Sequence, residues 1–211
     1  MPHVNYSVIA DHKLSDNAFA TLLVIRHLTN FKTSGQYYIS IPQIYHFLTG
    51  SMNMKQIVRI QFQKAIKELV SSDYVDGELS GNNIILINST YFDETKSWTF
   101  VRPEWIQQVY NLGERSKSSA LRYYCLLLAS RWNYEGKYVG HWSIFKLADV
   151  LGKTPTTISR YNKLLEDGKA IFVFRTYDRE TCNYYGLYDD RAIIYDFAMS
   201  QRTDRIFKVA T

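Results

Sequence analysis

Residues 147–168 read LADVLGKTPTTISRYNKLLEDG, and this stretch decides the fold. Two helices that meet at a steep angle need a small residue where their backbones touch and a glycine where the turn between them becomes left-handed. They also need a branched apolar side chain to fill the junction. Ala148, Gly152 and Ile158 follow one another at spacings of four and six residues, as this geometry requires. The stretch therefore predicts a short helix, a tight turn and a second helix packed around Ile158.

The second helix of this pair is predicted to carry a polar outer face. Thr154 is a suitable N-cap, and Pro155 fits the first turn. The inward positions are Ile158, Tyr161, Leu164 and Leu165. The outward positions carry hydroxyls and cations: Lys153, Thr156, Thr157, Ser159, Arg160 and Lys163. Hydroxyls at a helix N-terminus suit phosphate oxygens, and an arginine one turn further can reach a guanine edge in the major groove. We therefore predict a helix-turn-helix in which Thr154 and the outward residues contact duplex DNA.

Two strand-like runs, residues 169–176 and 184–188, follow the second helix and predict a β-hairpin. Arg175 at its base and Arg179 near its tip are placed to contact phosphates or the adjacent minor groove, as a wing does. Helix pairs of this kind also bind proteins, so an interaction scaffold is the alternative. The outward face has no acidic residue before Glu166, which favours DNA.

The same order of elements occurs twice along the chain: helix, strand, helix, helix, strand, strand. The first copy comprises residues 15–31, 37–41, 42–48, 53–71, 74–79 and 83–87. The second comprises residues 118–132, 138–139, 143–151, 154–167, 169–176 and 184–188. Gly50 and Gly152 close the short helix of each copy. The repeat predicts an α+β, mainly α, fold with two domains, over residues 1–90 and 118–190.

The long basic helix of the first copy, residues 53–71, allows two registers. Alignment from its C-terminal end places Phe62 where Ile158 lies and turns outward Arg59, Gln63, Lys64 and Lys67. Alignment from Gly50 favours instead Met54, Lys55 and Gln56. We prefer the first register because it preserves the apolar plug, although His46 replaces the small residue Ala148. The predicted DNA contacts of this copy are Lys55, Arg59, Gln63, Lys64 and Lys67, and a merely solvated basic helix is the alternative.

Two segments lie outside the repeats. Residues 91–117 are too apolar for a free linker, so we expect a connector that packs between the domains or forms a helix over residues 103–112. Residues 191–211 mix an apolar run with cations. They could pack as a helix, mediate a homodimer or form a basic arm, and the sequence does not choose among these.

Composition restricts the class of protein. The chain has 211 residues, a formal net charge of +5 and a pI of about 9.0. Its longest apolar stretches are far shorter than the roughly 20 residues that cross a bilayer, and its N-terminus lacks the pattern of a secretory leader. We therefore expect a cytoplasmic protein with no membrane association and with Cys125 and Cys182 as free thiols. The charge suggests a polyanionic partner only because its cations fall on one predicted face.

Signs of catalysis are lacking in the sequence. No pair among the five histidines has metal-ligand spacing with a cysteine or carboxylate. There is no glycine-rich phosphate loop before a Lys-Thr or Lys-Ser pair, and no nucleophile elbow. The acidic pair at residues 189–190 is typical of a loop or helix cap. We predict a protein that is not an enzyme and that uses no metal and no cofactor.

The quoted stretch and the paired element order resemble winged helix-turn-helix proteins, so we expect two such domains in tandem. Residues 14–31, LSDNAFATLLVIRHLTNF, and 37–48, YYISIPQIYHFL, are also similar to the start of winged-helix replication proteins from Gram-positive plasmids and phages, the initiators and replisome organisers. This resemblance implies sequence-specific binding to origin repeats and recruitment of replication proteins. His46 and the lack of a separate helicase-loader domain depart from it. A transcriptional regulator of a mobile element is the alternative within DNA binding.

Overall fold

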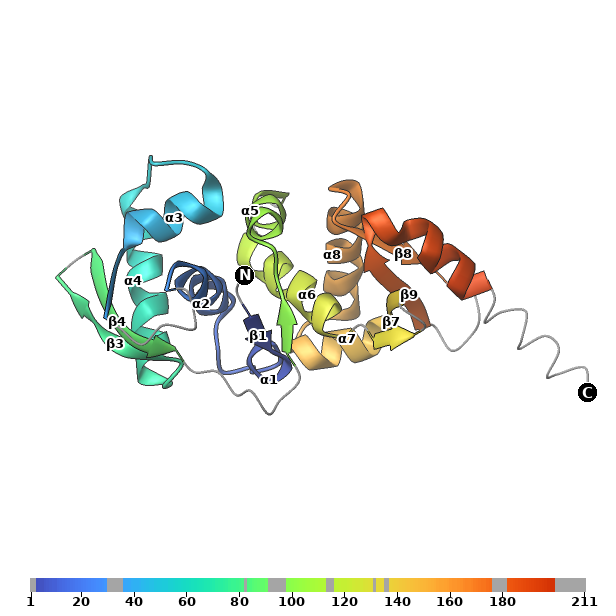
Figure 1. The fold of residues 1–211 in the computed structure, drawn as a ribbon, viewed down its shortest axis with the longest axis horizontal. Helices are drawn as coiled ribbons and strands as arrows, with labels where there is room; N and C mark the ends of the chain where they lie inside the picture. The colour runs from blue at the N-terminus through green and yellow to red at the C-terminus, as the bar shows by residue number, and fades with distance from the viewer. Residues whose placement is uncertain are drawn as a thin grey trace, which may run out of the picture. The chain divides into compact units, whose positions relative to one another are not determined.

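The computed structural model describes residues 3–29, 36–81, 83–90, 98–112, 116–130, 132–134, 137–175 and 182–199. The chain forms two compact units, which we call unit 1 (Met1–Ala129) and unit 2 (Ser130–Thr211) (Figure 1). Both units combine helices with small antiparallel sheets, and helices predominate. The predicted mixed class, α+β and mainly α, is therefore confirmed.

The central helix of unit 1 is α2 (Asp16–Leu28). The Ser15 hydroxyl caps it by accepting a hydrogen bond from the Ala18 N–H, and every residue from Ala18 to Arg26 is buried. The helices packed against it are α3 (Ile41–Thr49), α4 (Gln56–Ser71) and α6 (Lys117–Ala129). Because α2 is covered on several sides, it is apolar around most of its circumference rather than along one stripe.

A three-stranded antiparallel sheet completes the first copy of the repeat. Its strands are β2 (Tyr37–Ser40), β3 (Val75–Ser80) and β4 (Ile84–Thr90), in the order β2-β4-β3. Ile39 pairs with Ile85, and both are buried together with Ile87. The observed order of elements in the first copy is the predicted one.

The connector packs into unit 1. Helix α5 (Pro103–Leu112) covers the predicted residues, buries Ile106 and Val109, and packs on α3 and α6. The sequence did not predict that β5 (Trp98–Phe100) would pair with an N-terminal strand, β1 (His3–Asn5), which leads into the short helix α1 (Tyr6–Ile9). Segments of only three or four residues carry too little periodicity to be recognised.

A buried arginine ties the N-terminal segment to α6. Arg122 donates hydrogen bonds to the carbonyl oxygens of Ile9 (2.8 Å), Leu14 (2.6 Å) and Asp11 (2.5 Å). Its Nη1 also pairs with the Asp16 carboxylate at 3.1 Å, and its side chain is only 7% exposed. Arg122 therefore satisfies three carbonyls and one carboxylate with a single guanidinium.

The division of the chain falls after Ala129, whereas the sequence predicted that the second domain starts at Ser118. Helix α6 accounts for the difference, because it packs on α1, α2 and α5 and carries Arg122. Cys125 lies in this helix, and burial raises the pKa of its thiol. Cys125 and Cys182 are both free thiols, as expected.

Unit 2 contains a four-stranded antiparallel sheet. Its strands are β6 (Trp132–Tyr134), β7 (Lys137–Ser143), β8 (Ile171–Phe174) and β9 (Cys182–Leu187), in the order β6-β7-β9-β8. Helix α7 (Ile144–Leu151) packs on β7, and α8 (Pro155–Asp167) packs on α7 and β8. The order β7-β9-β8 repeats the order β2-β4-β3 of unit 1. Trp132, predicted as the last residue of a helix, lies instead in β6.

The C-terminal segment begins with a 3-10 turn over Tyr188–Asp190 and continues as a helix over residues 191–199. Ile194, Phe197 and Ala198 of this helix are buried in a cluster with Val139 and Tyr184 of the sheet. Of the three possibilities for residues 191–211, the packed helix therefore applies to residues 191–199. Residues 200–211 lie outside the described residues. Among the helices that the structure describes, none is both long and apolar enough to span a membrane.

Replacing Arg122 with methionine tests its structural role. The change should lower the free energy of unfolding by about 3 kcal/mol, because it leaves the Asp16 carboxylate and three buried carbonyls without their donor. Urea denaturation followed by circular dichroism measures the loss. The exposed Lys13 provides the control, and its replacement with alanine should change stability by less than about 0.5 kcal/mol. If Arg122→Met and Lys13→Ala had equally small effects on stability, Arg122 would not be what holds the N-terminal segment on α6.

Candidate nucleic-acid interface

The turn between α7 and α8 has the predicted geometry. Gly152 ends α7 in the left-handed region, with φ of 59°. The Thr154 hydroxyl caps α8 by accepting a hydrogen bond from the Thr157 N–H at 3.2 Å. Ala148 and Ile158 are both buried, as expected for the contact point and the plug of the pair. The predicted left-handed glycine, the predicted cap and the predicted burial of Ala148 and Ile158 are therefore confirmed.

Helix α8 separates its buried and exposed residues cleanly. The buried side consists of Ile158, Tyr161, Asn162 and Leu165, with Leu164 half-buried. The predicted DNA contacts on the other side are exposed (Thr154, Thr156, Ser159, Arg160 and Lys163) or half-buried (Lys153 and Thr157). The Arg160 guanidinium lies 5.8 Å from the centre of the Tyr161 ring. The burial of Asn162 was not predicted, because a polar residue gives no apolar signal.

Arg175 differs in setting from the other predicted contacts. Its guanidinium forms a two-point ion pair with the Glu166 carboxylate, with Nη1 3.0 Å from Oε1 and Nη2 in contact with Oε2. The pair joins the residue that follows β8 to the last turn of α8. Arg175 therefore lies at the loop end of the hairpin rather than at its base, and Glu166 offsets its charge. Arg179, predicted near the hairpin tip, lies outside the described residues.

In unit 1, α4 adopts the register that keeps the apolar plug. Phe62, Ala65, Ile66 and Leu69 are buried on one side of the helix. Of the predicted contacts, Lys55, Lys64 and Lys67 are exposed, whereas Arg59 and Gln63 are half-buried. The one carboxylate of α4 belongs to Glu68, which accepts hydrogen bonds from the Ser15 N–H and hydroxyl.

The second helices of the two pairs correspond residue by residue. Phe62 and Ile158, the two plugs, are 96 residues apart, and so are Leu69 and Leu165. Both helices also end in the same way, because Asp73 and Lys169 have positive φ angles of 59° and 53° and are 96 residues apart. With this offset Lys64 matches Arg160 and Lys67 matches Lys163, so each helix exposes two cations at equivalent positions.

The copies differ at the N-terminal end of these helices. Six residues, 50–55, separate α3 from α4, whereas three separate α7 from α8, and α4 has 16 residues against 13 in α8. The first turns of α4 expose Ile57 (67% exposed) and Ile60 (41%), and the preceding loop exposes Met52 (69%). The exposure of these three residues was not predicted. Ile57 and Ile60 fall outside the i, i+3, i+4, i+7 row that starts at Phe62, and this spacing indicates their exposure from the sequence.

A polar pocket of about 530 Å³ opens beside α4 within unit 1. Its lining includes the start of α6, at Ser116, Lys117, Ser118 and Ser119, the start of α2, and Tyr45 and Gln61. Asp16, the carboxylate of its wall, is paired with Arg122 and accepts a hydrogen bond from the Ser119 hydroxyl at 2.5 Å. The pocket therefore presents mainly hydroxyl and amide groups with one lysine.

Within the described residues, no group of three or more histidine, cysteine, aspartate or glutamate side chains is arranged to hold a metal ion. Comparison with known proteins adds no assignment. No protein-family model matches the chain, and no curated protein or solved structure is significantly similar to it.

Truncation of Phe62 tests the register of α4. Phe62→Ala should lower the free energy of unfolding by about 3 to 5 kcal/mol, because it leaves a cavity at the junction of α3 and α4. Ile57→Ala, five residues closer to the N-terminus, should change it by less than about 0.5 kcal/mol, because Ile57 is mostly exposed. Chemical denaturation of the two variants side by side measures both values. A larger loss for Ile57→Ala would require the other register.

Proposed function

We propose that the chain binds double-stranded DNA sequence-specifically through two winged helix-turn-helix domains, with α4 and α8 as recognition helices. One observation carries the proposal. At a constant offset of 96 residues, Lys64 and Lys67 on α4 match Arg160 and Lys163 on α8, and all four are exposed on the side opposite the buried row. If the basic helices were merely solvated, nothing would require two cations at equivalent positions in both copies.

The connectivity supports the same function. In each copy a strand leads into two helices, and two further strands return so that the last one pairs with the first. This arrangement holds the second helix against the first by its apolar row and leaves its opposite side protruding. A protruding helix of this width fits the major groove, where its side chains reach base edges.

The charges of the two helices also favour a polyanion. The single carboxylate of α4 accepts hydrogen bonds from Ser15. Of the two carboxylates in the last turn of α8, Glu166 pairs with Arg175 and Asp167 is exposed, at the end of the helix far from Thr156. Hydroxyl groups of Thr154, Thr156 and Ser159 surround the start of α8, where the helix dipole attracts phosphate. Residues suited to contact the DNA phosphates thus lie beside residues suited to contact base edges.

For the biological role, we propose initiation or organisation of plasmid or phage replication, with replication proteins as further partners. This choice rests on the resemblance in sequence pattern of residues 14–31 and 37–48 to such replication proteins, and not on significant similarity to any known protein. The pocket beside α4 favours a second candidate, a transcriptional regulator of a mobile element. A pocket of about 530 Å³ can hold a small polar effector, and Gln61 belongs both to its lining and to α4.

Titration with duplex DNA at several salt concentrations tests DNA binding. The logarithm of the affinity should fall linearly with the logarithm of the salt concentration, because bound cations displace counterions from phosphates. On a site selected from a random duplex library, Arg160→Ala should cost about 1 to 3 kcal/mol of binding free energy and relax the preference at one base pair.

Glu166→Gln is the matched control for that experiment. It releases Arg175 from its ion pair without shortening a side chain, so it should tighten binding to all sequences alike and steepen the salt dependence by about one unit of slope. Affinity that does not change with salt would refute DNA binding and leave the interaction scaffold. Salt-dependent binding with no preferred site in the library would refute sequence specificity.

Replication and regulation predict different outcomes in cells. A circular DNA that carries the coding sequence and the selected sites, but no other origin, should be maintained in a Gram-positive host if the chain initiates replication. Arg160→Ala should abolish this maintenance by weakening site binding. Repression of a reporter through a single selected site, without maintenance of the circle, would identify the chain as a regulator instead.

A further inference from the structure

We infer that the two recognition helices read different chemistry, and that α4 recognises the methyl groups of thymine through Ile57 and Ile60. The inference rests on the proposed function and adds the class of base pair that unit 1 selects. It predicts a site with two unlike halves, of which the half bound by unit 1 is rich in A·T pairs.

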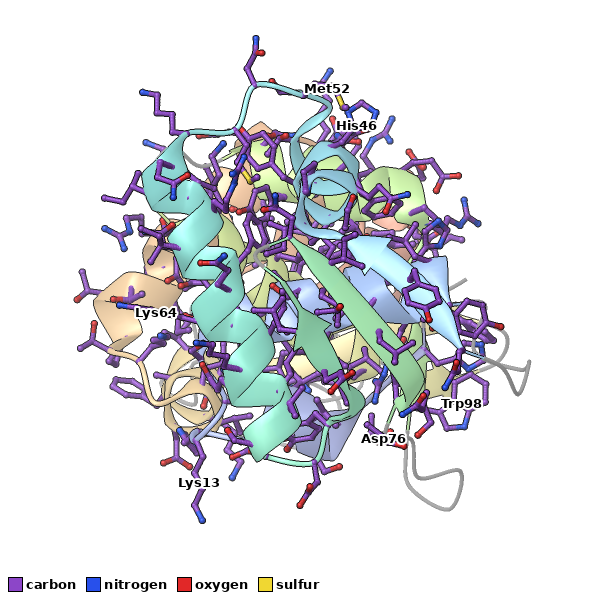
Figure 2. All side chains as sticks on the ribbon, turned by 90° about the vertical axis from the view of Figure 1, so that its left-hand side faces the viewer. Lys13, His46, Met52, Lys64, Asp76 and Trp98 are labelled. Carbon is purple, nitrogen blue, oxygen red and sulfur yellow. The ribbon has the colours of Figure 1, made fainter. Side chains whose placement is uncertain are left out.

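The first observation is the position of the two isoleucines. Ile57 and Ile60 lie in the first turns of α4, and Lys64 and Lys67 continue the same side of the helix at intervals of three and four residues. The buried row of α4 begins at Phe62 and does not include the isoleucines, which keep exposed surface on the other side of the helix. In Figure 2, α4 faces the viewer, with Lys64 on its outer side and Met52 in the loop beyond its N-terminus.

The second observation is the mixture of apolar and cationic groups on this one side. Exposed apolar side chains that adjoin one another on a soluble protein commonly mark a contact surface, whereas isolated ones do not. The partner must be apolar opposite Ile57 and Ile60 and anionic opposite the two lysines. The major groove of A·T-rich DNA has both properties, because the thymine C5-methyl group is the apolar feature of its floor and phosphates line its edges.

The third observation is the contrast with α8. At the offset of 96 residues, Ile60 corresponds to Thr156 of α8, whereas Ile57 lies in the additional first turn of α4 and the residue 96 positions later, Lys153, lies in the turn before α8. Where α4 offers methyl and methylene groups, α8 offers a hydroxyl and the turn before it an ammonium group. Groups that donate hydrogen bonds suit phosphates, guanine edges and other polar base edges, whereas aliphatic groups discriminate only through the methyl group of thymine. The two helices therefore carry cations at the same two positions, but the exposed residues N-terminal to these cations differ in chemistry.

Replacement of thymine by uracil tests the inference, because it removes the methyl group and retains the base pair. A site is first selected from a random duplex library, and nuclease footprints of the full chain and of Lys64→Ala/Lys67→Ala identify the half that unit 1 protects. Uracil in that half should weaken binding about fourfold for each methyl group contacted. Uracil in the other half should change the affinity less than twofold.

Substitutions in the two helices complete the test. Ile57→Ala and Ile60→Ala should each reduce the difference between thymine and uracil DNA in the half bound by unit 1. Lys64→Ala should weaken binding to both DNAs equally and keep their ratio. Thr156→Ala, at the position of α8 that corresponds to Ile60, should leave the ratio unchanged. Circular dichroism establishes that each variant is folded.

The outcomes separate the inference from the function on which it rests. Absence of salt-dependent DNA binding overturns the proposed function itself. Binding to a selected site that is insensitive to uracil in both halves overturns the thymine inference and leaves DNA binding intact. If Ile57→Ala and Ile60→Ala instead convert a dimer to a monomer in size-exclusion chromatography, with an unchanged thymine to uracil ratio, this side of α4 is a contact between copies and the inference is wrong.

Discussion

The burial of one row of four residues on α4, and of the equivalent row on α8, governs the rest of the structure. Each row begins at a plug, Phe62 or Ile158, and ends at a leucine near the last turn. A helix held by such a row can rotate very little, because rotation would expose the plug. Packing therefore determines which side chains face outward, and the helix pair with its hairpin holds them in a fixed arrangement.

Much of the fold could be predicted because the rows have the period of a helix and the turns contain residues with special backbone needs. Gly50 and Gly152 mark left-handed helix ends, and α5 began and ended at the predicted residues. The pairing of β1 with β5 could not be predicted, since it joins three-residue segments far apart in the chain. The assignment of α6 to unit 1 depends on Arg122, whose carbonyl partners are not visible in any periodic pattern.

The parts of the candidate site that follow from the buried rows of α4 and α8 could be predicted from the sequence. The parts that depend on contacts with residues of other elements could not. The exposure of Arg160, Lys163, Lys64 and Lys67 follows directly from the positions of the plugs. Arg175 was expected to face a ligand because its charge was considered alone. Glu166, nine residues earlier, reaches the same guanidinium only because the hairpin folds back along α8. The exposed Ile57 and Ile60 escaped notice for the opposite reason, since isoleucines are ordinarily assigned to a core.

The left-handed residues Asp73 and Lys169 show where the two copies differ in length. From plug to hairpin the copies keep one length, including a backbone conformation that is uncommon outside glycine and is adopted here by an aspartate and a lysine. The additional residues of the first copy all precede the plug, in the loop of residues 50–55 and in the first turn of α4. The difference in length is therefore confined to the end of the helix that lies outside the buried row. In each copy the packed part has a fixed length, whereas the exposed N-terminal end of the helix differs in both length and side-chain chemistry.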